Sequence, residues 1–238
     1  MKYSVTVFAY DFCHKKTHDI LISLNLHGIR NVLVIAAPMI KLNHKTEKKT
    51  FKSEKSDEVV HPSKICANFN YIYQVCSHDN VSEIKRHTLE NLSNIAIISG
   101  ARIIKKNIID LFYFGIINYH PGPLPETSGL DSIYWMIKKN AKPLASAHFI
   151  DSRVDAGELI EEYHLKVKLG DTLEIIKNNL YCAQLKLHNQ ICQKIINNEI
   201  LKTKKIVRPF KNNLMTEKQK KIALTNFESW KNHYSIKD

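Results

Sequence analysis

Glycine is scarce in this sequence, and long apolar runs are absent. Only seven of the 238 residues are glycines, and none lies at residues 9–13, where the first apolar run ends. A dinucleotide-binding fingerprint is excluded there, because the backbone needs glycine to approach a pyrophosphate. No apolar stretch is long enough to cross a bilayer, and residues 1–10 lack the features of a signal peptide. We therefore expect a cytoplasmic protein with no membrane partner.

Cysteine is also sparse, and its pattern disfavours a metal or disulfide scaffold. The five cysteines are odd in number and show no C-x-x-C spacing, so we expect reduced thiols. No group of His, Cys and carboxylate residues has ligand spacing, and no metal is expected. The chain is 44% hydrophobic and 24% charged, which is typical of one globular core with room for a small appended element.

Positive charge is the strongest bias of composition. The formal net charge is +12, and most of it lies in two segments. Residues 41–55 carry six lysines against two glutamates, a net +4; residues 202–221 carry seven lysines and one arginine against one glutamate, a net +7. Such a field favours an anionic partner, either nucleic acid or a phosphorylated small molecule. A lysine-rich bias with merely solvated side chains would give the same charge.

Apolar periodicity predicts alternating strands and helices along the chain. The predicted strands are 3–9, 31–36, 71–75, 95–98, 114–117, 145–150 and 159–167. The predicted helices are one that ends near residue 28 and others at about 62–68, 80–91, 105–111, 128–139, 171–198 and 216–234. This alternation is typical of an α/β fold with a mainly parallel sheet.

Capping signals predict two helix starts, and one polar stretch predicts a loop. Asn80 with Glu83, and Ser128 with Asp131, have the N-cap and N3 spacing of helix starts. Residues 38–60 are polar and have no clear period, which predicts a long loop.

Asn118, His120 and Asp155 form the most informative group of polar residues. Residues 118–129 read NYHPGPLPETSG, and Asp155 begins an Asp-Ala-Gly triplet. The three prolines fix φ angles and stiffen the turn. Ligands of open α/β sheets bind beyond the carboxyl ends of strands, where we expect Asn118 and His120. An amide, an imidazole and a carboxylate suit acyl transfer to an amine. Other histidines, including His148, sit in no comparable context, and we assign them no chemistry.

The order Asn-x-His-Pro-Gly-x-Leu-Pro, with a glycine four residues on and a later Asp-x-Gly, resembles the 10-formyltetrahydrofolate-dependent formyltransferases. This similarity covers about residues 97–160. The family includes methionyl-tRNA formyltransferase, glycinamide ribonucleotide transformylase, formyltetrahydrofolate deformylase and the nucleotide-sugar N-formyltransferases. Two positions depart from it: Gly122 stands where many relatives carry Ser, and Ser128 where many carry Arg.

The resemblance implies a Rossmann-like formyltransferase fold, with a catalytic domain over 1–200 and a mostly helical C-terminal extension over 201–238. The Asn118 amide would donate to the developing oxyanion, His120 would move protons near neutral pH, and Asp155 would orient the imidazole. The formyl donor would be 10-formyltetrahydrofolate. The expected cofactor-binding residues are Ser99, Gly100, Arg102, Ile103, Ile150 and Asp151.

Among the branches of the family, the nucleotide-sugar N-formyltransferases fit best. Glycinamide ribonucleotide transformylase has a glycine-rich loop after its first strand, where this chain has Asp11-Phe12-Cys13. The deformylases have an N-terminal regulatory domain and methionyl-tRNA formyltransferase has a C-terminal β-barrel, neither of which we expect here. The acceptor would be a dTDP-linked 4-amino-4,6-dideoxyglucose or its 3-amino isomer, destined for O-antigen or other lipopolysaccharide biosynthesis at the bacterial surface.

The excess of lysine and the C-terminal aromatic residues suggest contacts for such an acceptor. The expected substrate-binding residues are Lys41, Lys45, Gly122, Pro123 and Trp230. Trp230 fits a core position as well as a base-stacking one. Methionyl-tRNA as the acceptor stays open, as do a homodimeric assembly and a basic nucleic-acid-binding module without activity. For the last of these, only Phe51 interleaves the lysines of 41–55, so no nucleic-acid partner is expected.

Overall fold

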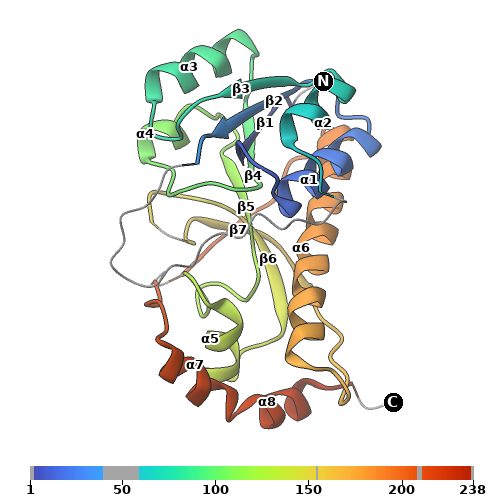
Figure 1. Cartoon of the computed structure of the whole chain (residues 1–238), viewed down its shortest axis with the longest axis vertical. Helices are drawn as coiled ribbons and strands as arrows, with labels where there is room; N and C mark the ends of the chain where they lie inside the picture. Colours follow the sequence, from blue (N-terminus) through green and yellow to red (C-terminus); the bar gives the residue numbers. More distant parts are fainter. Residues whose placement is uncertain (1–2, 40–58, 154, 208–210, 237–238) are drawn as a thin grey trace. The chain divides into compact units, whose positions relative to one another are not determined.

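The structure is a computed structural model that describes residues 3–39, 59–153, 155–207 and 211–236. The chain forms two compact units (Figure 1). The first consists of Met1–Ile116 with Cys192–Glu199, and the second of Ile117–Ile191 with Ile200–Asp238. The expected division at residue 200 stays a prediction.

The first unit contains parallel strands in the order β3-β2-β1-β4. Val5 of β1 lies opposite Val32 of β2 and Ile95 of β4. The two central strands, β1 and β2, are almost entirely buried, which explains their continuous apolar sequences. The strands are β1 (Val5–Tyr10), β2 (Val32–Ala37), β3 (Ile72–Val75) and β4 (Ile95–Ile98).

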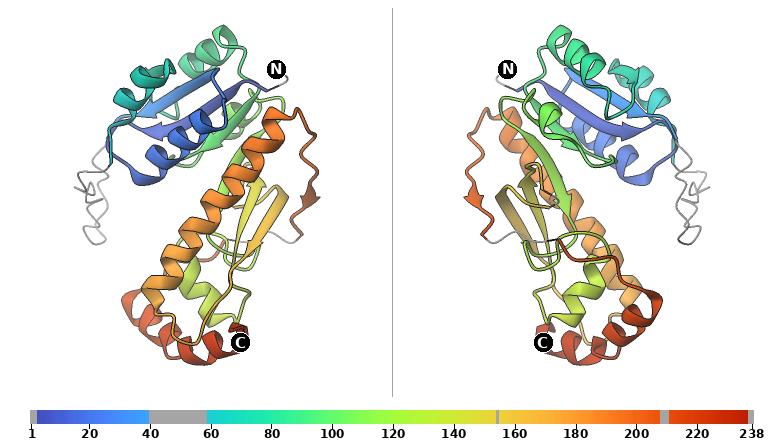
Figure 2. Two further views of the ribbon diagram at one scale, coloured as in Figure 1. Left: turned by 90° about the vertical axis from the view of Figure 1, so that its right-hand side faces the viewer. Right: turned by 90° about the vertical axis from the view of Figure 1, so that its left-hand side faces the viewer.

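Helices pack along these strands, as Figure 2 shows. They are α1 (Lys15–Leu26), α2 (Pro62–Phe69), α3 (Val81–Glu90) and α4 (Lys106–Ile109). The predicted capping of α3 is confirmed, because Asn80 accepts from the Glu83 backbone N–H and donates to the Glu83 carboxylate. The five cysteines all lie in the described ranges and form no disulfide there, and burial raises the pKa of Cys66 and of Cys192 to about 12.

The second unit contains antiparallel strands, with β6 between β5 and β7. In register, Asn118 lies opposite His148 and His120 lies opposite Ser146. The strands are β5 (Ile116–His120), β6 (Leu144–Phe149), β7 (Glu158–His164) and the short β8 (Lys204–Lys205). The α/β fold class is therefore confirmed, with the parallel strands in the first unit and antiparallel strands in the second.

Four helices belong to this part of the chain: α5 (Ser132–Lys138), α6 (Leu173–Ile196), α7 (Glu217–Leu224) and α8 (Phe227–Tyr234). The last residues of α6 belong to the first unit. A core cluster joins α5, α6 and α8 through Met136, Leu180 and Trp230, so α8 shares the core of the second unit. None of the helices in the described ranges is both long and apolar enough to cross a membrane.

Two predicted boundaries near the proline-rich turn of residues 121–125 were wrong. The strand expected over 114–117 is Ile116–His120, so Asn118 and His120 lie within the strand rather than after it, because β6 pairs with both residues. The helix expected from residue 128 begins at Ser132. Ser128 does not cap it, because its hydroxyl donates to the Pro125 carbonyl; the N-cap is Asp131, with φ of +60°. Most of the predicted loop over 38–60 lies outside the described residues.

Candidate active site

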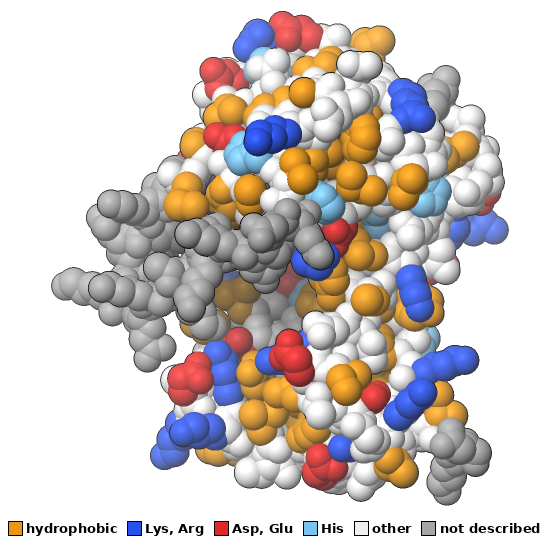
Figure 3. Space-filling view, turned by 45° about the vertical axis from the view of Figure 1, so that its right-hand side comes forward, with side chains coloured by type: hydrophobic (Ala, Val, Ile, Leu, Met, Phe, Trp, Pro, Cys, Tyr) orange, Lys and Arg blue, Asp and Glu red, His pale blue; other side chains and the backbone are white. Residues whose placement is uncertain are grey.

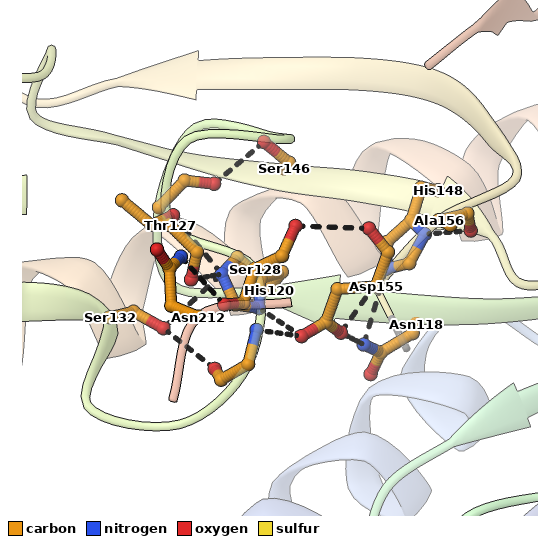
Figure 4. Close-up of polar contacts among 12 residues, drawn as sticks. Asn118, His120, Thr127, Ser128, Ser132, Ser146, His148, Asp155, Ala156 and Asn212 are labelled. Atoms are coloured by element: carbon orange, nitrogen blue, oxygen red, sulfur yellow. Dashed lines mark hydrogen bonds and ion pairs between the residues drawn. The ribbon is translucent and has the colours of Figure 1, made fainter. Parts of the chain in front are cut away.

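Asn118, His120 and Asp155 come together in the second unit. The side chains of Asn118 and His120 lie on the same face of β5, because they are two residues apart on a strand. Asp155 follows β6 and has a positive φ of +48°. Figure 4 shows the three side chains pointing toward one another, together with His148 of β6.

His120 is buried between a carboxylate and a tight turn. Its Nδ1 lies 3.5 Å from Asp155 Oδ2. Its Nε2 lies 3.0 Å from the Thr127 carbonyl oxygen and 3.2 Å from the Ser132 hydroxyl. The Thr127 carbonyl can only accept, so this contact favours a proton on Nε2. Nδ1 is then the nitrogen that faces Asp155, where a second proton would make a charge-assisted contact.

Asp155 is held by donors from two sides. Its Oδ2 accepts a hydrogen bond from the Gly129 backbone N–H over 2.6 Å, and its Oδ1 accepts one from the Asn118 amide over 3.3 Å. The Ser128 hydroxyl, which donates to the Pro125 carbonyl, also lies 3.3 Å from the Asp155 backbone carbonyl. These contacts fix the carboxylate beside the imidazole.

His148 is a site residue that the sequence did not reveal. Its side chain is fully buried; its Nδ1 lies 3.2 Å from the Ala156 carbonyl, and its Nε2 lies 3.2 Å from the Asn118 amide nitrogen. Burial is the main cause that lowers its pKa to about 4, and the neighbouring His120 lowers it further, while Asp155 opposes the shift. At neutral pH the ring is therefore uncharged, donates from Nδ1 and accepts from Asn118 at Nε2.

Only the pairing of β5 with β6 identifies His148 as a site residue. It lies in a strand that the sequence predicted correctly, over 145–150, but its position opposite Asn118 depends on the pairing of β5 with β6. A mainly parallel sheet gives no reason to place these two residues side by side.

The packing of the turn explains why residue 122 is a glycine. A Cβ atom at this residue would lie 2.2 Å from Thr127 Oγ1, so a serine there would displace Thr127. The Thr127 hydroxyl donates to the Pro123 carbonyl and the Ser146 hydroxyl donates to the Gly122 carbonyl. Gly122 and Pro123 are buried in this turn, and their expected contact with substrate stays a prediction.

The expected cofactor-binding residues lie in two places. In the first unit, Ser99 donates to the Phe8 carbonyl, Gly100 leaves room for the Tyr10 ring, and Arg102 contacts the Pro38 carbonyl. Ile103 is 70% exposed and offers an apolar surface.

In the second unit, Ile150 follows β6 and Asp151 pairs with Arg153, whose hydrogen bond lowers the pKa of the Asp151 carboxyl. A cofactor contact by any of these residues stays a prediction.

Trp230 is not available to stack on a nucleotide base. It is 2% exposed, its ring lies between Phe227 and Tyr234, and its indole N–H donates to the Ala141 carbonyl over 2.8 Å. Trp230 follows the apolar pattern of its helix because it fills the core, so the prediction that it contacts substrate was wrong. The other predicted contacts of this kind, Lys41 and Lys45, lie outside the described residues.

Part of the C-terminal positive charge is paired internally. The Lys220 ammonium lies 3.3 Å from Asp131 and 3.0 Å from Glu217, and its side chain is largely buried. On the face drawn in Figure 3, Lys and Arg side chains are scattered among acidic and hydrophobic ones rather than gathered in one patch. Within the described ranges, no group of three or more His, Cys, Asp or Glu residues could hold a metal ion.

Comparisons with known proteins agree with this arrangement. A family model described as formyl transferase matches residues 17–191. Phosphoribosylglycinamide formyltransferase from Bacillus subtilis (strain 168) is 22% identical over 133 residues, which are 53% of this chain and 68% of that protein.

Solved structures share the fold. The phosphoribosylglycinamide formyltransferase from Anaplasma phagocytophilum aligns with a TM-score of 0.60 at 16% identity, over 82% of this chain and 88% of that one. An N-formyltransferase from Helicobacter canadensis, solved with folinic acid and dTDP-3-aminofucose, aligns with a TM-score of 0.60 at 16% identity, over 91% of this chain and 72% of that one. Because the family match includes Asn118, His120 and Asp155, we conclude that this chain belongs to the formyl transferase family and that its chemistry is formyl transfer.

Proposed function

We propose that this protein transfers a formyl group from 10-formyltetrahydrofolate to the amine of a nucleotide-linked amino sugar. The observation that carries the proposal is the meeting of Asn118, His120 and Asp155 at one buried point of the second unit. An uncharged amide donor, an imidazole and a carboxylate are the groups that acyl transfer to nitrogen requires.

Each residue of the site has a role that follows from its chemistry. Asn118 carries an amide that does not titrate, and it would exchange its 3.3 Å donor contact with Asp155 Oδ1 for the oxygen on which negative charge develops. His120 and Asp155 form the pair that would take up the proton lost by the attacking amine, with Asp155 holding the charge opposite the ring. His148 would keep the Asn118 amide in place, since it is a neutral acceptor 3.2 Å away.

The formyl donor supplies an activated acyl group, and the residues present suit it. In the second unit, Asn118, His120 and Asp155 offer donors and a proton acceptor for an acyl group. In the first unit, the loop expected over residues 99–104, with the exposed Ile103, would provide backbone and apolar surface for a pterin ring. Support also comes from the Helicobacter canadensis enzyme, whose structure holds folinic acid.

Two observations favour a nucleotide-linked amino sugar over glycinamide ribonucleotide as the acceptor. The nucleotide-sugar enzyme from Helicobacter canadensis aligns with 91% of this chain, whereas the phosphoribosylglycinamide enzyme aligns with 82%. In addition, Asp11 follows β1, accepts a hydrogen bond from the Tyr73 hydroxyl over 2.5 Å and lies 3.7 Å from His61 Nε2. A phosphate bound at this turn would meet the Asp11 carboxylate, which like-charge repulsion disfavours.

The test is incubation with 10-formyltetrahydrofolate and a panel of acceptors, followed by mass measurement. The panel contains dTDP-linked 3-amino and 4-amino dideoxyhexoses, glycinamide ribonucleotide and methionyl-tRNA. We expect one dTDP-amino sugar to gain one formyl group, in a reaction that needs the folate and is lost in His120→Asn. Formylation of methionyl-tRNA or glycinamide ribonucleotide alone would overturn the acceptor, and an entirely unmodified panel would overturn the proposed function.

A further inference from the structure

Several hydrogen bonds attach the C-terminal segment 211–215 to α5, with its N-cap Asp131, and to the turn of residues 126–129 (the catalytic turn). The Met215 backbone N–H donates to Asp131 Oδ2 over 3.1 Å, and the Trp135 indole N–H donates to the Asn213 carbonyl over 3.2 Å. Lys220 forms an ion pair with the other oxygen of Asp131. This segment follows the residues that the family model matches, which end at 191.

Asn212 makes the central contacts of this attachment. Its side-chain Nδ2 donates to the Ser128 carbonyl over 2.8 Å and to the Glu126 carbonyl over 3.0 Å. Its backbone N–H also donates to the Ser128 carbonyl, over 3.0 Å. The side chain is buried, so each of these donors has exchanged water for a carbonyl of the catalytic turn.

Lys139 fixes which way the Asn212 amide points. Its ammonium lies 2.6 Å from Asn212 Oδ1 and 2.8 Å from the Glu126 carbonyl. An ammonium can only donate, so the oxygen of the Asn212 amide faces Lys139 and its nitrogen faces the turn.

Gly129 lies directly between Asn212 and the catalytic carboxylate. Its φ is +95°, and a Cβ atom built on it would lie 2.8 Å from the Asn212 carbonyl oxygen. Only glycine tolerates both conditions. On its other side, the Gly129 N–H donates to Asp155 Oδ2, the oxygen that faces His120 Nδ1. Figure 4 shows Asn212, Ser128 and Asp155 in this arrangement.

We propose that Asn212 is a positioning residue, which holds the 126–129 turn so that the Gly129 N–H fixes the Asp155 carboxylate opposite His120. The C-terminal segment thereby completes a catalytic site whose reacting groups all come from elsewhere in the chain. This role in turnover rests on the proposed function, whereas the contact from Asn212 through Gly129 to Asp155 does not depend on which acceptor is used.

The contact can be measured without a substrate. Labelling with serine carrying a ¹³C carbonyl and with ¹⁵N-glycine selects the two Ser-Gly pairs of the sequence, at Gly100 and Gly129. A short hydrogen bond to an ionised carboxylate shifts an amide proton downfield. In Asn212→Ala the Gly129 proton should move upfield, while the Gly100 proton, in the first unit, stays in place. Asp155→Asn should move the same resonance and so confirms its assignment.

Kinetic measurements then test whether loss of the Asn212 contact slows turnover. In Asn212→Ala, kcat should fall roughly tenfold to a hundredfold, because a misplaced catalytic group slows the reaction more than it weakens binding. The KM of each substrate should change by less than about twofold. The matched control is Asn213→Ala, which removes an exposed neighbouring amide and should leave both the Gly129 resonance and kcat as in the wild type.

Each outcome decides the proposal. An unmoved Gly129 resonance in folded Asn212→Ala overturns it, as does a moved resonance with unchanged kcat. If no acceptor is formylated by the wild type, the resonance alone decides whether Asn212 controls the Gly129 contact, and the proposed function fails separately. If Asn212→Ala does not fold, Lys139→Met removes the exposed ammonium that orients the amide and should shift the resonance in the same direction by less; an unmoved resonance there also overturns the proposal.

Discussion

The side-chain amide of Asn118 donates to Nε2 of His148 over 3.2 Å. The same amide nitrogen lies 3.3 Å from Asp155 Oδ1, so its donors face two acceptors. A rotation of the amide would lose both contacts. His148 performs this role only as a neutral ring, because a protonated Nε2 could no longer accept.

This arrangement predicts a pH-dependent stability. Burial lowers the pKa of His148 to about 4, from an ordinary value of 6.5. Between these values the unfolded chain binds more protons at this residue, so the folded state gains stability as pH rises from 4 to 6.5 and loses it as pH falls. In His148→Gln this loss should be smaller than in the wild type, as measured by urea unfolding at several pH values. His164→Gln, an exposed histidine on β7, should behave as the wild type does; equal slopes for His148→Gln would contradict the prediction.

His120→Asn should abolish most of the turnover. Asparagine keeps a hydrogen-bond donor near the Thr127 carbonyl but cannot carry a proton at neutral pH. We expect kcat to fall by roughly a hundredfold to ten-thousandfold, with both ligands still bound in titrations. His164→Asn is the matched control and should keep wild-type turnover. A near wild-type rate in folded His120→Asn would rule out proton transfer by this imidazole.

Asp155→Asn should cost a similar factor, because it removes the negative charge 3.5 Å from His120 Nδ1. Residues that act as a unit are not additive, so the double variant of His120 and Asp155 should be little slower than either single one. Steady-state kinetics of the three variants measure this coupling. Asp110→Asn, an exposed carboxylate on the surface of the first unit, should have no effect. Multiplicative losses in the double variant would show that the two residues act independently.

Replacement of Gly157 should destabilise the fold strongly. Its φ is +107°, and a Cβ atom would lie 2.1 Å from the Phe149 carbonyl oxygen. The strained backbone alone costs about 1–3 kcal/mol, and relief of the clash adds to this, so Gly157→Ala should lose at least about 3 kcal/mol of unfolding free energy. Gly170→Ala is the control, because nothing lies within 4 Å of its added Cβ, and it should change stability by less than about 0.5 kcal/mol. Denaturant unfolding of both variants gives the comparison.

The sequence predicted the elements that carry their own local signals. The cap at Asn80 and the apolar runs of β1, β2 and β4 are specified by neighbouring residues, so the pattern located them closely. The Asn118, His120 and Asp155 group was predicted because three residue types in one order are far more specific than any one of them.

The failures share a physical cause, which is that tertiary contacts override local signals. Ser128 has the spacing of a helix cap, but its hydroxyl contacts the Pro125 and Asp155 carbonyls instead. The position of His148 depends on strand pairing, and periodicity cannot distinguish an aromatic residue that fills the core, such as Trp230, from one that faces a ligand. No sequence pattern pointed to a role for Asn212, because its partners are carbonyls about 85 residues earlier in the chain.

The packing of Trp230 also gives the second unit its own optical probe. The chain contains two tryptophans, and the other, Trp135, is half-exposed with Lys138 and Lys139 near its ring. In Trp135→Phe, emission would come from Trp230 alone, and a buried indole that donates to the Ala141 carbonyl should fluoresce at short wavelength. A red shift at denaturant concentrations too low to unfold the whole chain would show that α8 separates from the core before the strands of this unit open.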